Sequence, residues 1–277
     1  MVDPRDAELR RIVDANLVEY GRFMARATPG GQATEEAGAL LVAGATASPA
    51  IVNSAFMARS SVDPAAMLPA ASTFFRTRAH GYGIWTRDDA DAALEAALPA
   101  AGFVLVTDMP LMVLDDQPPE RPAPAGVIVL PVTDEAGAAD FRLVAFDGFA
   151  EDEEERSAVK SKFTAAAGLL APEVASAVAY VDGRPVAAAM SFTAVGCARI
   201  SWVGTLPEHR RRGLGAAVTR AAIRGGFDRG ARFSALESSA LGAPVYRALG
   251  FREIGRNRIW SLPSTEPTTK PTTDGLA

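Results

Sequence analysis

The first half of the chain alternates an amphipathic helical stretch with short apolar runs. Residues 4–26 place Leu9, Val13 and Leu17, among others, at helical spacing, which predicts a long amphipathic helix. The apolar runs that follow predict extended segments, and the Asp-Pro pair at 63–64 predicts a helix start. The predicted elements of this half are a helix at 4–26, extended segments at 38–45 and 50–57, a helix from about residue 63, a strand at 81–86, a helix at 88–98 and two short strands around Pro110 within 103–114.

The second half has the pattern of a mixed α/β domain. The β-branched run at 127–132 predicts a strand, Asp134 is typical of a helix N-cap, and the Asp-Gly pair at 182–183 predicts a hairpin turn. The predicted elements are strand 127–132, helices 134–146 and 151–163, strands 174–181, 185–193 and 198–206, helix 214–227, strand 233–236, helix 243–249 and strands 251–254 and 258–262. Their order predicts a mixed sheet flanked by helices.

A proline-rich segment separates the two halves. Residues 115–126 read DDQPPERPAPAG and show no apolar periodicity, as is typical of a linker between domains. We therefore expect an N-terminal α/β domain at 1–118, a linker at 119–126 and a second domain at 127–262. The Pro- and Thr-rich end, 263–277, is expected to be disordered.

Composition excludes several function classes. Every apolar run is too short to span a membrane, and the charged N-terminus lacks the apolar core of a signal peptide, so we expect a cytosolic protein without membrane contact. One cysteine and two histidines argue against a metal site, so no metal cofactor is expected. A net charge of −5 argues against a nucleic-acid partner, because such a partner requires a clustered basic field.

The stretch at 203–217, VGTLPEHRRRGLGAA, carries the clearest chemistry. An apolar strand leads into a loop with Gly213 and Gly215, and this loop opens a helix. Free backbone N–H groups and the positive end of the helix dipole converge there, which predicts a phosphate site.

Two motifs in this half resemble those of the GNAT N-acetyltransferase superfamily. The first is Arg210-x-x-Gly213-x-Gly215, and the second is Tyr246-Arg-Ala-Leu-Gly250-Phe251, about 30 residues later. The resemblance covers about half of the chain. It implies a GNAT-like fold for the second domain, acetyl-CoA as cosubstrate and an amine as acceptor.

The resemblance also implies roles for particular residues. The backbone amides from Arg211 through Ala216 would bind the diphosphate of coenzyme A, and Arg210 and Arg212 either pair with phosphates or are simply solvated. The strand end would hold the pantetheine arm and polarise the thioester carbonyl, with Gly204 suited to a bulge or to close packing. Tyr246 would protonate the departing thiolate. The expected cofactor-binding residues are Val203, Gly204, Thr205, Arg210, Arg211, Arg212, Gly213, Leu214, Gly215, Ala216 and Ser239.

The general base is less well defined by the sequence. Glu237 follows a predicted strand and is our candidate, although a Glu at this place also suits a turn cap. The acidic run 151–155 either attracts a cationic amine or provides favourable charge at a helix start. Ser238 and Ser239 stand near a position where relatives often have Asn. Cys197 is expected to be a small core residue, because the sequence places no histidine beside it.

A faint repeat links the two halves. Residues 100–114 align with 248–262, each with Gly-Phe between a helix and extended segments, and Leu98 stands where the second half has Tyr246. The first half lacks the Arg-x-x-Gly-x-Gly loop, so we expect a degenerate GNAT-like domain that does not catalyse. It either closes a wall of the acceptor site or forms a homodimer surface.

The sequence therefore favours an acetyltransferase that acts on a primary amine by direct attack. A non-catalytic acyl-CoA-binding regulatory module is the alternative that an uncertain base leaves open. A nucleotide-phosphate binder is a third reading, but the loop lacks the Gly-Lys-Ser/Thr of a P-loop.

Overall fold

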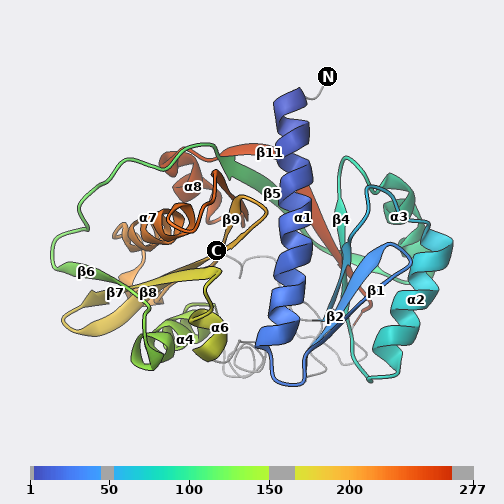
Figure 1. Cartoon of the computed structure of the whole chain (residues 1–277), viewed down its shortest axis with the longest axis horizontal. Coiled ribbons are helices and arrows are strands. Elements are labelled where there is room, and N and C mark those ends of the chain that lie inside the picture. Colours follow the sequence, from blue (N-terminus) through green and yellow to red (C-terminus); the bar gives the residue numbers. More distant parts are fainter. Residues whose placement is uncertain (1–2, 45–52, 150–165, 264–277) are drawn as a thin grey trace. The chain divides into compact units, whose positions relative to one another are not determined.

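Two compact units make up the part of the chain that the structure describes. A computed structural model describes residues 3–44, 53–149 and 166–263. The first unit contains the described residues up to Pro110 together with those from Gly255 on, and the second contains the described residues of Leu111–Ile254. Both units are shown in Figure 1.

The first unit is a three-layer α/β domain. Its elements are α1 (Pro4–Ala27), β1 (Gln32–Glu36), β2 (Ala39–Ala43), β3 (Ser54–Met57), α2 (Pro64–Arg76), β4 (Gly83–Arg87), α3 (Ala92–Ala97), the 3-10 turn η1 (Pro99–Ala101) and the N-terminal part of β5 (Val104–Leu114), joined by the end of β11 (Arg252–Ser261). Strands β1 and β2, β2 and β3, and β4 and β11 pair antiparallel, whereas β3 and β4 pair in parallel.

Strand β2 shows why both faces of this sheet are covered. Leu40 and Val42 pack in one core cluster with residues of α1, and Leu41 and Ala43 pack in another with residues of α2. Side chains alternate across a strand, so an uninterrupted apolar run such as 39–43 buries both faces. Figure 1 accordingly shows α1 on one face of these strands and α2 on the other.

The second unit is also a layered α/β domain. Its elements are β6 (Val127–Pro131), α4 (Glu135–Phe149), α6 (Ala166–Leu169), β7 (Val174–Val181), β8 (Arg184–Ala194), β9 (Cys197–Thr205), the 3-10 turn η2 (Pro207–His209), α7 (Leu214–Phe227), β10 (Phe233–Glu237) and α8 (Ala243–Leu249), with the remaining parts of β5 and β11. The strand order is β5-β10-β9-β8-β7-β6. Only β9 and β10 of these neighbours are parallel.

Helices α7 and α8 share one core with the sheet of the second unit. The cluster joins Leu214 and Val218 of α7 to Tyr246 of α8 and Leu236 of β10. Gly226 permits a close approach of α7, because a Cβ there would lie 2.5 Å from the Cβ of Ala198. Helix α4 covers the other face (Figure 1). The mixed α/β class predicted from the sequence is confirmed.

Two strands belong to both units. Strand β5 continues through Pro110 and pairs with β10 from Leu111 on, and β11 runs on to pair with β4. The expectation of two short strands at each of these places was wrong, because Pro110 lies outside the ladder with β10 and therefore breaks none of its hydrogen bonds. The units also differ from the predicted ranges 1–118 and 127–262 at these strands, and residues 115–126 belong to the second unit.

The proposed repeat has a counterpart in backbone geometry. The N–H of Phe103 donates to the carbonyl of Leu98, and the N–H of Phe251 donates to that of Tyr246, both at 3.0 Å. Gly102 and Gly250 both have positive φ, at 87° and 101°, and this conformation favours glycine. Both helical segments therefore end in the same way.

Some predicted elements differ from the structure or lie outside it. Strand β1 was missed because all five of its residues are exposed, so no apolar alternation marks it. The predicted helix 151–163 and the end 264–277 lie outside the described residues, as does part of the predicted segment 50–57. No helix in the ranges that the structure covers is long and apolar enough to cross a membrane.

Candidate active site

The loop before α7 leads into a helix N-terminus that no side chain caps. Arg211 and Gly213 both have positive φ, at 59° and 77°. Gly213 is the N-cap, and the first helical hydrogen bond runs from the N–H of Ala217 to the carbonyl of Gly213. No side chain caps this helix, so the amides of Leu214, Gly215 and Ala216 lack an acceptor from α7. An anion can satisfy them.

The loop lies against the end of β9. A Cβ on Gly215 would lie 3.6 Å from the Thr205 hydroxyl oxygen, and the Arg210 Nε donates to the Thr205 carbonyl at 3.1 Å. Arg212 contacts His209 through Nη1 and Nδ1 at 2.9 Å. All three arginines of the loop are exposed. The structure thus brings together the predicted strand end, glycine loop and helix start.

Strands β9 and β10 separate just before this loop. Their parallel pairing ends at Arg199 and Ala235, although β9 continues to Thr205 and β10 to Glu237. Backbone groups of β9 beyond Arg199 therefore have no partner on β10. An extended ligand can bind in such a fork by strand-like hydrogen bonds.

A bulge accompanies this separation. Met190 is opposite Ser201 but Ala188 is opposite Gly204, so β9 carries one extra residue. Trp202 within it has φ of 54°, a strained value for a bulky side chain. Gly204 itself pairs with Ala188, so the bulge that Gly204 was expected to suit lies just before it. No sequence pattern predicts the conformation of Trp202, since a bulky residue rarely adopts positive φ.

Tyr246 is held in the core beside α7. It is 6% exposed, packs edge-to-face on Phe251 at 5.9 Å and borders Gly242, where a Cβ would lie 2.8 Å from its ring. Burial raises the pKa of Tyr246 well above its ordinary value near 10. The phenol therefore keeps its proton at neutral pH, although a higher pKa also makes it a weaker acid toward a thiolate.

Glu237 forms a buried ion pair that the sequence did not predict. It accepts a hydrogen bond from Arg199, and the two side chains are only 10% and 3% exposed. Arg199 lies in the apolar strand β9, and only the parallel register with β10 brings the two residues together. If Glu237 took up a proton, the buried guanidinium would lose its counter-charge.

Ser239 has a role in the turn before α8. Its hydroxyl accepts from the N–H of Gly242 at 3.0 Å, and its carbonyl accepts from the N–H of Ala243 at 3.0 Å. The hydroxyl of Ser238 donates to the Ser239 carbonyl at 2.8 Å. These bonds fix the start of the helix that carries Tyr246.

Cys197 lies at the closed base of the fork. It is fully buried and pairs with Phe233 in the parallel ladder. Burial raises the pKa of its thiol to about 12, against a smaller opposing effect of Arg199. This environment is that of a core residue. The acidic run 151–155 lies outside the described residues, and no group of three or more His, Cys, Asp or Glu side chains in the described part could hold a metal ion.

Strands β9 and β10 separate next to the uncapped start of α7. This arrangement suits an extended ligand that ends in phosphate. Residues 140–251 match the model of the acetyltransferase (GNAT) family, and this region is a GNAT acetyltransferase domain. The match supports acyl transfer from an acyl-CoA, since the family uses acetyl-CoA as cosubstrate. No curated protein sequence matches the chain.

Solved structures share the fold over most of the chain. A GCN5-related N-acetyltransferase from Kribbella flavida is 22% identical with a TM-score of 0.70, covering 92% of this chain and 95% of that one. A GCN5-related N-acetyltransferase from Sphaerobacter thermophilus is 17% identical with a TM-score of 0.55, covering 84% and 83%. A tandem GNAT protein from the clavulanic acid biosynthesis pathway is 16% identical with a TM-score of 0.55, covering 82% and 79%. The chain thus shares a mixed α/β fold with GNAT proteins, one of them a tandem GNAT protein.

Proposed function

We propose that the second unit transfers the acetyl group of acetyl-CoA to a primary amine by direct attack. The observation that carries this proposal is the uncapped start of α7 beside the fork between β9 and β10. The amides of Arg211 through Ala216 bind the diphosphate, and the strand end at Val203, Gly204 and Thr205 receives the pantetheine arm.

The reaction needs one proton donor and one proton acceptor. The amine lone pair attacks the thioester carbonyl carbon, and a backbone N–H of the strand end stabilises the resulting oxyanion. The C–S bond then breaks, and Tyr246 donates its proton to the departing thiolate. The products are an amide and free coenzyme A, and the phenolate recovers a proton from solvent.

The amine must lose a proton, and Glu237 is the candidate acceptor. Its ion pair with the buried Arg199 makes proton uptake there costly, and this favours removal of the amine proton through water. Direct removal of this proton by Glu237 remains the alternative route. A cationic acceptor, a cytosolic location and a homodimer also stay predictions.

Thiol release from acetyl-CoA, followed across a panel of small primary amines and peptide N-termini, tests the proposal. We expect amine-dependent release of coenzyme A together with an acetylated product detected by mass spectrometry. Protection of the protein by coenzyme A against thermal unfolding, without turnover of any amine, would instead support a non-catalytic acyl-CoA-binding regulatory module. Protection by ATP but not by coenzyme A would contradict both.

A further inference from the structure

A cleft opens in the first unit, and no residue assigned to acyl transfer lines it. Its volume is about 460 Å³, within the range of roughly 300–1,000 Å³ typical of small-molecule sites. Residues of α1, Glu35 of β1, the loop after β3 and the loop after β4 line it. All lining residues lie between Ala7 and Ala90.

The cleft lies where α/β sheets commonly bind ligands. Strands β3 and β4 are the parallel pair of this unit, and their pairing ends at Ala55 and Ile84. Residues close after the two strands, Ala58 to Ser60 and Asp89 to Ala90, belong to the lining. Ligands of open α/β sheets bind in the crevice outside the carboxyl ends of such strands.

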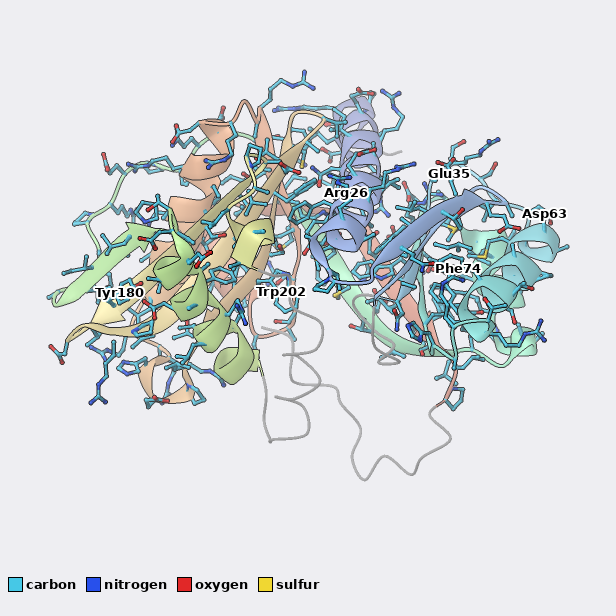
Figure 2. The ribbon with its side chains drawn as sticks, turned by 60° about the horizontal axis from the view of Figure 1, so that its bottom comes forward. Arg26, Glu35, Asp63, Phe74, Tyr180 and Trp202 are labelled. Carbon is cyan, nitrogen blue, oxygen red and sulfur yellow. The ribbon has the colours of Figure 1, made fainter. Side chains whose placement is uncertain are left out.

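The start of helix α2 is closed to a diphosphate, and none of its residues lines the cleft. Helix α2, which follows β3, is capped by the Asp63 carboxylate, which accepts from the N–H of Ala65 at 3.0 Å (Figure 2). Pro64 supplies no N–H at the first helical position. A negative cap and a missing donor oppose anion binding at this helix start.

The floor of the cleft is a closed network of charges. Arg87 donates to Asp91 at 2.7 Å and to the carbonyl of Arg59 at 2.9 Å. Arg10 donates to Asp14 at 3.1 Å and to Asn257 at 2.7 Å. Because Arg10 and Arg87 are buried and already have acceptors, this floor holds the two loops in place without a ligand.

The rim, by contrast, carries exposed or partly exposed charges of both signs. Arg59 is exposed, and its guanidinium has no carboxylate partner within the described ranges. Asp89 is half exposed, and its carboxylate lies 3.5 Å from the guanidinium of Arg10. On another wall Arg22 lies between Glu19 and Glu35, at 3.1 and 2.7 Å, with Glu35 projecting from β1 (Figure 2).

We propose that this cleft binds a small zwitterion of the α-amino acid class. Arg59 binds the carboxylate and Asp89 binds the ammonium group, and each forms a charge-assisted hydrogen bond. A purely anionic ligand would meet the carboxylates of Asp89, Glu19 and Glu35, and a purely cationic one would meet Arg59 as well as Arg11 and Arg22. A ligand with both charges is complementary to this mixed rim. The site is independent of the proposed acyl transfer.

Calorimetry with the full chain and a panel of free L-amino acids tests this proposal. We expect at least one amino acid to bind, and its N-acetyl derivative and its methyl ester, which each lack one charge, to bind at least roughly tenfold more weakly. Arg59→Gln and Asp89→Asn should each weaken binding by a similar factor. Arg76→Gln, which replaces an exposed arginine of α2 outside the cleft, is the matched control and should leave the affinity unchanged.

Further measurements separate this site from the acyltransfer site. Arg59→Gln and Asp89→Asn should retain the wild-type unfolding temperature and the wild-type rate of thiol release, whereas Tyr246→Phe should retain amino-acid binding. The proposal is overturned if no amino acid binds at millimolar concentration, if the blocked derivatives bind as well as the free amino acid, or if both cleft variants keep the wild-type affinity.

Discussion

Helices α2 and α7 begin at corresponding places in the two units, yet only α7 leaves its first amides open. Each follows the first strand of a parallel pair, β3 for α2 and β9 for α7. The N-cap of α2 is Asp63, whose carboxylate accepts a backbone N–H, whereas the N-cap of α7 is Gly213, which offers no side chain. The cap residue is therefore one difference between a helix start that is closed to anions and one that is open to them.

The segments that follow the second strand of each pair, α3 after β4 and α8 after β10, also differ in a group needed for catalysis. Tyr246 in the second unit corresponds to Leu98 in the first, since each carbonyl accepts the N–H of the phenylalanine five residues later. Leu98 is fully buried and has no proton to donate. The first unit thus keeps the packing of the fold and lacks both the anion site and the acid.

Tyr246→Phe should have the largest effect on catalysis among these substitutions. Phenylalanine keeps the packing on Phe251 but removes the proton donor, so kcat should fall by roughly 10²-fold or more, with little change in KM for acetyl-CoA. Steady-state thiol release measures both constants.

Tyr82→Phe is the matched control in the first unit. Tyr82 is 5% exposed, packs edge-to-face on Phe103 at 5.6 Å, and burial raises its pKa to about 12. Its loss should leave kcat unchanged. A similar kcat for both variants and the wild type would remove Tyr246 from the role of acid.

Gly213→Asp should make the start of α7 resemble that of α2. A carboxylate at this N-cap would compete for the open amides and repel a diphosphate, so KM for acetyl-CoA should rise by about 10- to 30-fold, equivalent to about 1.4–2 kcal/mol. Kinetics at varied acetyl-CoA concentration would show this.

Gly213→Asn separates charge from shape. Asparagine has nearly the same size and tolerates positive φ, which is 77° at this position. KM should rise much less than in Gly213→Asp, and the difference should shrink in high salt. Equal effects of the two substitutions would indicate a steric cause and would argue against a bound phosphate.

Local patterns in the sequence predicted much of this comparison. The bounds 214–227 and 243–249 agree with α7 and α8, because glycines at 213 and 250 mark a helix start and a helix end. The open start of α7 was predicted for the same reason, since Gly213 and Gly215 stand directly after an apolar strand.

Pairings between distant residues could not be predicted in this way. The ion pair of Arg199 with Glu237 joins residues 38 positions apart and depends on the register of β9 against β10. The continuation of β5 and β11 into both units likewise depends on partners far along the chain. Local periodicity carries no information on register between parallel strands.

The residues that begin the two parallel strand pairings should contribute differently to stability at alkaline pH. Cys197 begins the β9–β10 pairing and Ser54 begins the β3–β4 pairing, and both are fully buried. Burial raises the pKa of Cys197 from 9.0 to about 12, so the folded state holds this proton more tightly than the unfolded state. The resulting stability is complete below pH 9 and is lost as pH rises from 9 to 12, by at most about 1.4 kcal/mol per pH unit.

Denaturant unfolding at several pH values, for the wild type and for Cys197→Ala, measures this contribution. Cys197→Ala should reduce the slope of the unfolding free energy between pH 9 and 12, while Ser54→Ala should keep the wild-type slope. A thiol reagent should modify Cys197 only after unfolding, because the side chain is fully buried in the native fold. Rapid modification of the native protein would contradict this account.

Asp63→Ala tests whether the cap alone closes the first unit. Loss of the hydrogen bond to the N–H of Ala65 should cost about 1 kcal/mol and lower the unfolding temperature by about 2–4 °C. Coenzyme A should still not bind to this unit, because Pro64 withholds an N–H and Arg87 fixes the loop after β3 through the carbonyl of Arg59. Titration of coenzyme A into Asp63→Ala combined with Gly213→Asp, which weakens the site in the second unit, isolates any new binding. A second site of micromolar affinity in that variant would mean that Asp63 alone had closed the first helix start; its absence would show that Pro64 and Arg87 also contribute.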